Sequence, residues 1–291
     1  MTMAPTMPDL VAAVGAAPAS GEAHLHLADA FARAGKLIPA IAEYRTALTL
    51  GGENAEIRVR IAKCTAVVVA RQPVDTISHN LYSRTQWLAR HIRSLFPSGR
   101  FSILDAGGGD GRLAMDLPDA DYVLAEPATN GVFVTEELSF GRKFDCVVCC
   151  HVLEHIPIAA RDAFLDGLCG MANDYLLLLN PVVDSRIDQR AWQQAIYEVT
   201  GALWAKEHID CVMPRLEDIT GYAERRGYRH RVRPNGSKAT ALAVAFFDHF
   251  SRFGRPDQVA RINRMFNSIA LDDLDSAEWP NAYLVEIQTK K

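Results

Sequence analysis

The side chains that suggest chemistry gather in one stretch, Asp105-Ala-Gly-Gly-Gly-Asp-Gly111. An apolar run ends at Asp105, and glycines follow at positions 107, 109 and 111. This order predicts a strand, a tight turn and a helix capped by Asp110, and a glycine turn lets the backbone lie against a flat ligand. A dinucleotide-binding turn requires Gly or Ala where this chain has Arg112. We therefore expect a ligand without a pyrophosphate.

A second acidic residue follows the next apolar run. Glu126 comes 21 residues after Asp105 and directly follows Tyr122–Ala125. A carboxylate at the end of a strand can accept both hydrogen bonds from a ribose diol. Asp105 would repel a pyrophosphate but suits a ligand with a cationic end. Together the two acids predict a nucleoside ligand that carries positive charge and no phosphate.

These residues resemble motif I and the acid after strand 2 of class I S-adenosylmethionine (SAM)-dependent methyltransferases. The segment 143–156 is similar to strand 4 and the following loop of that family, in the type 11/12-like branch in which Leu-Glu-His follows the strand. The resemblance implies an α/β fold with a Rossmann-like seven-stranded sheet and SAM as the cofactor. The SAM-binding residues that it implies are Asp105, Gly107, Gly109, Gly111, Glu126 and Cys150.

The resemblance implies two further contacts with SAM. In this family the segment before the first helix of the sheet domain often folds over SAM, and here residues 78–83 offer Tyr82. Ordinary packing of Tyr82 is the alternative. The family also often has an acid after strand 3 that binds the adenine amino group, which here would be Glu136 or Glu137. A backbone contact from the same loop could replace it.

Three histidines are candidates for a base that removes a proton from a methyl acceptor. His151 follows the expected strand 144–150, His155 is four residues further on, and His208 lies in a later helical stretch. Each can titrate near neutrality. His151 is the first choice, and the alternative is that His151 and His155 only orient their loop while Glu154 caps the next helix. An amine or carboxylate acceptor would need no strong base.

The sequence predicts a metal-independent protein. Asp184 and Asp188 are present, but no arrangement typical of a metal-dependent catechol-type methyltransferase stands out. Cys146 and Cys149 have C-x₂-C spacing inside an apolar run, where small buried side chains are the better interpretation. The residues from Cys150 onward read Cys-His-Val-Leu instead of the Asn/Asp-Pro-Pro-Tyr that often serves amine methylation. A DNA or RNA base is therefore disfavoured as the acceptor.

Composition limits the partners and the compartment. A hydrophobic content of 49% with 23% charged residues is typical of a globular protein. The net charge of −4 provides no electrostatic attraction to nucleic acid or to an anionic membrane. Neither a transmembrane-length apolar run nor a signal peptide is evident. We expect a cytoplasmic protein that binds neither nucleic acid nor a membrane.

Two domains are expected: a helical segment at 1–72 and a methyltransferase domain at 73–291, with a helical lid inserted at 186–227. Residues 22–50 resemble a tetratricopeptide repeat (TPR), but His24 and Gly52 depart from its pattern. The matching residues are Leu27, Ala28, Phe31, Ala40, Tyr44 and Ala47. One and a half repeats cannot bury their own faces. The segment therefore either braces the catalytic domain or a dimer, or docks a peptide or carrier protein.

The remaining elements follow from apolar periodicity. Strands are expected at 101–105, 121–126, 131–135 (weak), 144–150, 175–180, 228–233 and 279–289, and further helices at 55–69, 76–96, 111–117, 216–226, 239–253 and 256–269. The function predicted is methyl transfer from SAM to a small molecule, such as a sugar or secondary-metabolite hydroxyl, because the aromatic lid suits a small acceptor. A protein- or carrier-directed methyltransferase and a non-catalytic SAM-binding scaffold are the alternatives.

Overall fold

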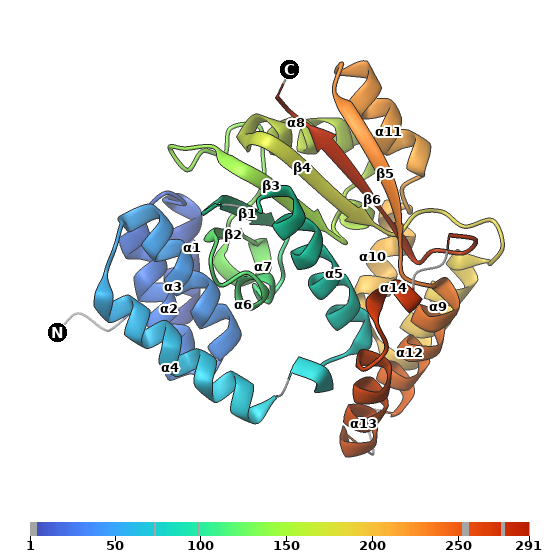
Figure 1. Ribbon diagram of the computed structural model, residues 1–291, viewed down its shortest axis with the longest axis horizontal. Helices are drawn as coiled ribbons and strands as arrows, with labels where there is room; N and C mark the ends of the chain where they lie inside the picture. Colours follow the sequence, from blue (N-terminus) through green and yellow to red (C-terminus); the bar gives the residue numbers. More distant parts are fainter. Residues whose placement is uncertain (1–4, 73, 98, 252–255, 275–276, 291) are drawn as a thin grey trace.

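The computed structural model describes residues 5–72, 74–97, 99–251, 256–274 and 277–290. A six-stranded sheet lies at its centre, with helices on both faces (Figure 1). The strands are β1 (Ser102–Ala106), β2 (Asp121–Ala125), β3 (Phe144–Cys150), β4 (Ala172–Asn180), β5 (Arg229–Asn235) and β6 (Ala282–Gln288). None of the helices in the described ranges is both long and apolar enough to cross a membrane.

The order of the strands creates a crevice. The sheet runs β2-β1-β3-β4-β6-β5, in which β1 to β4 are parallel and β6 is antiparallel to both of its neighbours. The chain runs outward from β1 to β2 and returns to β3 on the other side of β1. Open α/β sheets bind ligands at such a switch point, outside the carboxyl ends of the strands. The loops that follow β1 and β3 are therefore the expected site.

Alternation of side chains along the strands builds two apolar layers. One face packs against α5 (His79–Leu95) and α6 (Leu113–Asp116), and the other against α8 (Arg161–Met171) and α11 (Leu216–Arg225). The predicted helix at 111–117 starts later than expected, because Arg112 and not Asp110 occupies its N-cap position. The single turn α7 (Pro127–Asn130) follows β2.

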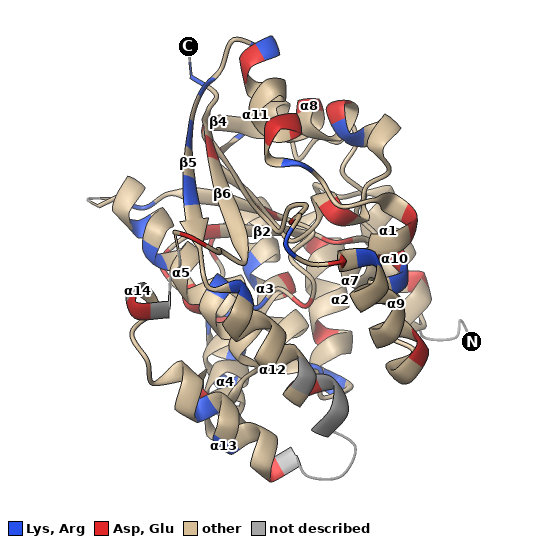
Figure 2. Cartoon of the chain, turned by 90° about the vertical axis from the view of Figure 1, so that its right-hand side faces the viewer, with Lys and Arg blue, Asp and Glu red and all other residues tan. Residues whose placement is uncertain are grey.

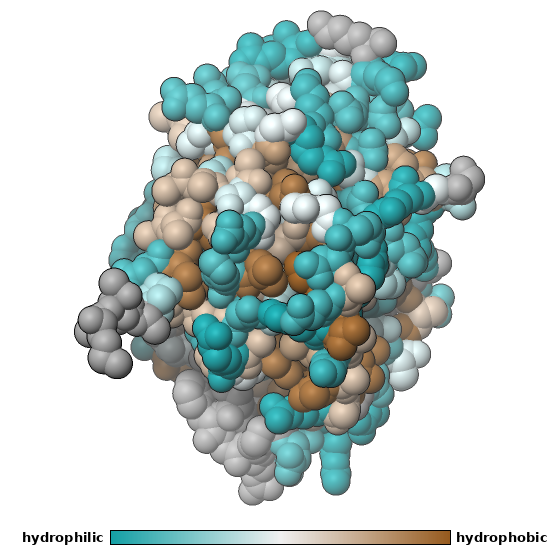
Figure 3. All heavy atoms as spheres, turned by 90° about the vertical axis from the view of Figure 1, so that its left-hand side faces the viewer, coloured by the Kyte–Doolittle hydropathy of each residue, from teal (hydrophilic) through white to brown (hydrophobic). Residues whose placement is uncertain are grey.

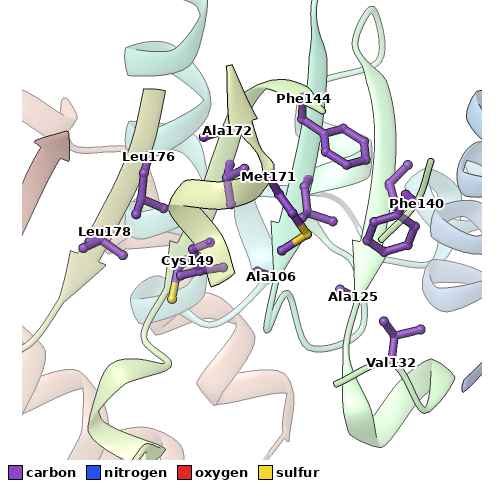
Figure 4. Close-up of a cluster of buried hydrophobic side chains, with 14 of the residues drawn as sticks. Ala106, Ala125, Val132, Phe140, Phe144, Cys149, Met171, Ala172, Leu176 and Leu178 are labelled. Atoms are coloured by element: carbon purple, nitrogen blue, oxygen red, sulfur yellow. The ribbon is translucent and has the colours of Figure 1, made fainter. Parts of the chain in front are cut away.

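The predicted seventh strand is wrong, because residues 131–135 form no strand. Val132 and Phe140 instead point into the apolar cluster on one face of the sheet, beside Phe144 and Met171 (Figure 4). The rings of Phe140 and Phe144 meet edge to face with centroids 5.7 Å apart. The apolar residues of this loop therefore cover the sheet instead of extending it.

The N-terminal helices are α1 (Met7–Ala16), α2 (Gly21–Arg33), α3 (Leu37–Gly51) and α4 (Ala55–Arg71). The pair α2 and α3 confirms the predicted helical hairpin, whereas its likeness to a TPR stays a prediction. Seen from their side, apolar side chains lie among hydrophilic ones (Figure 3), and Val59, Val67 and Val69 of α4 are exposed. The expected domain boundary falls at residue 73, outside the described residues.

Helix α3 joins these helices to the open edge of the sheet. Its Thr46 hydroxyl accepts a hydrogen bond from the N–H of Leu124 in β2 at 3.1 Å. The buried Arg45 guanidinium donates to three carbonyls that lie around α6, those of Ala114, Leu117 and Ala120. Burial lowers the pKa of Arg45 to about 10. A helix that carries polar side chains thus lies along the β2 edge of the sheet.

The C-terminal half adds helices near the carboxyl ends of the strands (Figure 1). These are α9 (Gln189–Thr200), α10 (Leu203–Cys211), α12 (Lys238–Ser251), α13 (Pro256–Asn267) and α14 (Leu271–Leu274), with short 3-10 turns η1 (Val74–Thr76), η2 (Leu153–His155) and η3 (Ile158–Ala160). Helix α12 corresponds to the helix predicted at 239–253, of which 252–253 lie outside the described residues. Charges of both signs are interspersed on this side (Figure 2).

Replacing Arg45 with alanine should lower the free energy of unfolding by about 3–5 kcal/mol, because the buried carbonyls around α6 lose the three hydrogen bonds that Arg45 donates. Urea denaturation followed by circular dichroism measures the change. Arg58→Ala is the control, because Arg58 pairs with Glu53 at the exposed surface and its loss should cost less than about 1 kcal/mol. Equal losses in the two variants would show that Arg45 does not secure this edge.

Candidate functional site

The glycine turn after β1 is crowded at its ends and open in its middle. Gly107, Gly109 and Gly111 all have left-handed φ values, of 74°, 61° and 80°. A Cβ on Gly107 would lie 2.3 Å from Val152 Cγ2, and one on Gly111 would lie 2.3 Å from Ala42 Cβ. Nothing lies within 4 Å of a Cβ placed on Gly109. The turn therefore needs glycine for contact at both ends and presents bare backbone between them.

Glu126 stands at the end of β2 beside this bare backbone. Its Oε2 accepts a hydrogen bond from the N–H of Gly109, and its Oε1 accepts one from the N–H of Ala128, each at 3.0 Å. The Thr129 hydroxyl donates to the carbonyl of Gly109 at 2.8 Å. The carboxylate is partly exposed and retains lone pairs for two more donors. Glu126 can therefore hold the turn and still accept hydrogen bonds from a diol.

Asp105 lies beneath the turn instead of on its open side. Its side chain is 2% exposed, and its Oδ2 accepts a hydrogen bond from the Tyr122 hydroxyl at 2.7 Å. A Cβ on Gly108 would lie 2.3 Å from the same oxygen. Burial raises the pKa of Asp105 to about 7. The carboxyl group supports the turn from below, and its contact with a cationic ligand stays a prediction.

The other proposed cofactor residues lie in different surroundings. Cys150 ends β3 beside the switch point, and burial raises the pKa of its thiol to about 12. Tyr82 lies in the first turns of α5 and is half-buried, and it is not among the residues that line the main cavity. Glu136 is exposed, in a loop whose backbone packs against Gly167 of α8. The structure does not bring Glu136 to the histidines.

A cavity of about 960 Å³ opens between the ends of β3 and β4 and the helices α5, α9, α10, α12 and α13. The lining residues used below are Arg84, His151, Glu154, Trp192, His208 and Lys238. Neither the glycine turn nor Glu126 lines this cavity. Arg84 connects the two regions, because it is close enough to Asp110 and His151 to influence the pKa of each.

Glu154 lies at the centre of the polar groups in the cavity. Its side chain is 1% exposed, its Oε2 accepts a hydrogen bond from the Asn180 amide at 2.6 Å, and its Oε1 makes no hydrogen bond. His151 Nδ1 lies 3.4 Å from that Oε1. Burial lowers the pKa of His151, whose backbone has a left-handed φ of 57°. Glu154 caps neither η3 nor α8, so the predicted cap is wrong, whereas the alternative that His151 and His155 only orient their loop stays a prediction.

The other two predicted histidines meet on the same side. His155 Nε2 and His208 Nε2 lie 3.2 Å apart, and His208 Nε2 is 4.0 Å from Glu154 Oε1. Glu207 Oε2 lies 2.7 Å from His155 Nδ1. Burial lowers the pKa of His208 to about 4, so its imidazole is neutral at pH 7. The structure thus brings together all three histidines that the sequence singled out.

Sequence reasoning missed several side chains of the cavity. Lys238 starts α12, and burial lowers its pKa. The indole N–H of Trp192 in α9 is buried and has no hydrogen-bond partner among the described residues. Arg84 and Asn180 come from elements that were predicted only as parts of the scaffold. Asn180 ends an apolar run and Arg84 lies among polar residues, and neither pattern indicates a cavity, because burial depends on contacts between distant segments.

Comparison with known proteins gives distant structural similarities. No family model and no curated protein matches the chain. The plantazolicin methyltransferase BpumL in complex with SAH (S-adenosylhomocysteine) is 10% identical with a TM-score of 0.44, covering 88% of this chain and 99% of that chain. The magnesium protoporphyrin IX methyltransferase ChlM from Synechocystis PCC 6803, with bound SAH, is 14% identical with a TM-score of 0.39, covering 71% and 83%. Likeness at this level does not assign an activity.

The buried Asp105 should make stability depend on pH. Because its pKa is about 7 in the folded protein and about 3.9 in an unfolded chain, the unfolded state loses its proton first as pH rises. The contribution of Asp105 to stability should therefore fall between about pH 4 and pH 7, by roughly 4 kcal/mol. Asp105→Asn should lack this decline, as measured by denaturation across the pH range. The exposed Asp119→Asn is the control; if Asp105→Asn parallels it, the burial argument fails.

Proposed function

We propose that the protein is a SAM-dependent methyltransferase that acts on a small molecule. The observation that carries this proposal is the pairing of two features at one switch point. On one side, bare backbone at Gly109 lies beside the Glu126 carboxylate. On the other, His151 directly follows β3 and faces a cavity about 960 Å³ in volume, within the range of small-molecule sites.

The residues of the turn fit a nucleoside. A planar or sugar group can approach Gly109 because no side chain fills the space beside it. Glu126 would accept the ribose hydroxyls, as its position at the end of β2 suggests. Arg112 stands where a dinucleotide-binding turn requires Gly or Ala, which disfavours a pyrophosphate. SAM, when bound, supplies a methyl group on a positively charged sulfur.

The cavity would hold the acceptor, for which we propose a hydroxyl of a sugar or secondary metabolite. His151 is the proposed base: with its Nδ1–H directed at Glu154, its Nε2 lone pair can take the hydroxyl proton. Trp192 would donate its free N–H to the acceptor. Arg84 and Lys238 add positive charge to the cavity wall. The protein's main contribution is to align the two reactants.

A protein- or carrier-directed methyltransferase is the second candidate. The exposed valines of α4 favour it, whereas the burial of α3 against β2 favours a brace. Deleting residues 1–72 should cause aggregation, because it uncovers the β2 edge and the apolar surface around it; size-exclusion chromatography measures this. A monodisperse truncated protein that binds SAH but loses its acceptor would support docking.

Replacing Glu126 with alanine should weaken SAH binding by about 1.5–3 kcal/mol, the usual contribution of hydrogen bonds to a charged group. Isothermal titration calorimetry measures the change. Glu224→Ala is a matched control, since Glu224 is an exposed glutamate of α11 that is not a candidate cofactor residue. Unchanged affinity in Glu126→Ala would remove Glu126 from the site, and absence of SAH binding by the wild type would refute the proposed function.

His151→Ala should lower turnover by about 100-fold or more, the usual contribution of a general base, with little change in SAH affinity. Production of SAH from SAM with candidate acceptors measures turnover. His26→Ala on the exposed side of α2 should behave like the wild type. Full turnover without His151 would exclude it as the base.

A further inference from the structure

One group of side chains in the cavity has the composition of a metal site. Within the described residues, Glu154, His155 and His208 each offer a ligand atom, and these atoms all lie within 4.8 Å of one another. The sequence predicts metal independence, because no metal-binding arrangement stands out in it. Glu154 and His208 are 54 positions apart, so this group forms no local motif. We propose that these three side chains bind one divalent transition-metal ion.

The distances suit a small ion. His155 Nε2 and His208 Nε2 are 3.2 Å apart, and His208 Nε2 and Glu154 Oε1 are 4.0 Å apart. Donors that bind one ion at about 2.1 Å lie about 3.0–3.4 Å from each other in tetrahedral or octahedral geometry. The histidine pair already meets this spacing. The Glu154 oxygen, 4.0 Å from His208 Nε2 and within 4.8 Å of the His155 ligand atom, must approach by roughly 0.6–1.4 Å.

The surroundings of His155 prepare its Nε2 to bind an ion. Glu207 Oε2 lies 2.7 Å from His155 Nδ1, so this nitrogen carries a proton that it donates to the carboxylate. In the neutral ring, Nε2 then has a free lone pair, and it faces His208. Metal-binding histidines commonly donate their other N–H to a carboxylate in this way.

Glu154 supplies an independent observation. Its Oε2 is fixed by the Asn180 amide, while its Oε1 is buried without a hydrogen bond. A buried carboxylate oxygen without a partner is costly. A cation between Glu154 and the two histidines would satisfy this oxygen. The histidine ring nearest to it, that of His151, lies at 3.4 Å, too far for a strong hydrogen bond.

His208 requires one adjustment. The Gln193 amide nitrogen lies 3.4 Å from His208 Nδ1. Rotating this amide by half a turn presents its oxygen, which would accept a proton on Nδ1 and leave Nε2 free for the ion. Gln193 is buried in α9. The rotation exchanges the positions of its amide oxygen and nitrogen and does not move the helix.

The ligand set indicates the class of ion and its use. Two imidazole nitrogens and one carboxylate oxygen are typical of zinc and non-haem iron sites that keep an open position. His155 and His208 line the cavity, so the open position faces the proposed acceptor. An acceptor oxygen on the ion would lose its proton to His151 more readily. This role rests on the proposed function, whereas metal binding by the three residues does not.

Metal titration of the full chain tests the proposal. After treatment with a chelator, Zn²⁺ competition against a chromogenic chelator should show one ion bound per chain. His208→Ala and Glu154→Gln should each lower the affinity at least 100-fold. Glu207→Gln, at an exposed position, should lower it about 10-fold to 100-fold because it disturbs only the outer hydrogen bond. His26→Ala is the matched control and should bind like the wild type.

Circular dichroism of each variant distinguishes the loss of a metal-binding side chain from the loss of the fold. If a variant of a buried residue unfolds, Glu207→Gln, at an exposed position, still tests the proposal. Absence of stoichiometric Zn²⁺ binding by the wild type, or wild-type affinity in a folded His208→Ala variant, would overturn the proposal. SAH calorimetry on the same samples distinguishes the two claims. If the protein binds SAH but does not bind Zn²⁺, only the metal site is refuted. If it binds Zn²⁺ but does not bind SAH, only the proposed methyltransferase function is refuted.

Discussion

The contact between α3 and the edge of β2 is the constraint on which the rest of the structure depends. It is made by buried polar side chains rather than by an apolar stripe alone. Glu43 pairs with His24 on one side and accepts a hydrogen bond from the Asn130 amide on the other. The Asn130 side-chain oxygen accepts the N–H of Glu126. An unbroken series of hydrogen bonds therefore runs from the N-terminal helices to the acid at the end of β2.

Helix α3 also packs against the glycine turn. Ala42 of α3 leaves no room for a side chain at Gly111, and Arg45 holds the carbonyls around α6. The turn, α6 and Glu126 are thus positioned by a segment that precedes the sheet in sequence. The later helices α9, α10 and α12 then enclose the cavity beyond β3 and β4. In the proposed function, one end of the switch point binds a nucleoside and the other binds the acceptor.

Much of this arrangement could be predicted where local pattern determines structure. The glycine spacing predicted the turn, and apolar runs predicted all six strands, because strand burial imposes a simple pattern. The prediction of a strand at 131–135 was wrong. Val132 lies in a stretch of sequence that resembles a strand, yet its side chain packs onto the face of the sheet. Arg45 and Thr46 interrupt the apolar stripe of α3, and nothing local indicates that they would be buried.

The chemistry was predictable only in part for the same reason. The histidines stood out because few side chains titrate near neutrality. A helix cap was one alternative for Glu154, whereas its partner Asn180 comes from the end of the next strand. The sequence did not indicate that Asp105 would be buried and would accept a hydrogen bond from the hydroxyl of Tyr122. In each case a partner distant in sequence decides the role of the residue.

A crystal structure of the protein with SAH tests the central claim most directly. We expect the ribose hydroxyls on Glu126, the adenosine against the backbone at Gly109, and the sulfur directed toward His151 and the cavity. SAH bound elsewhere, or side chains filling the space beside Gly109 in the complex, would contradict this assignment.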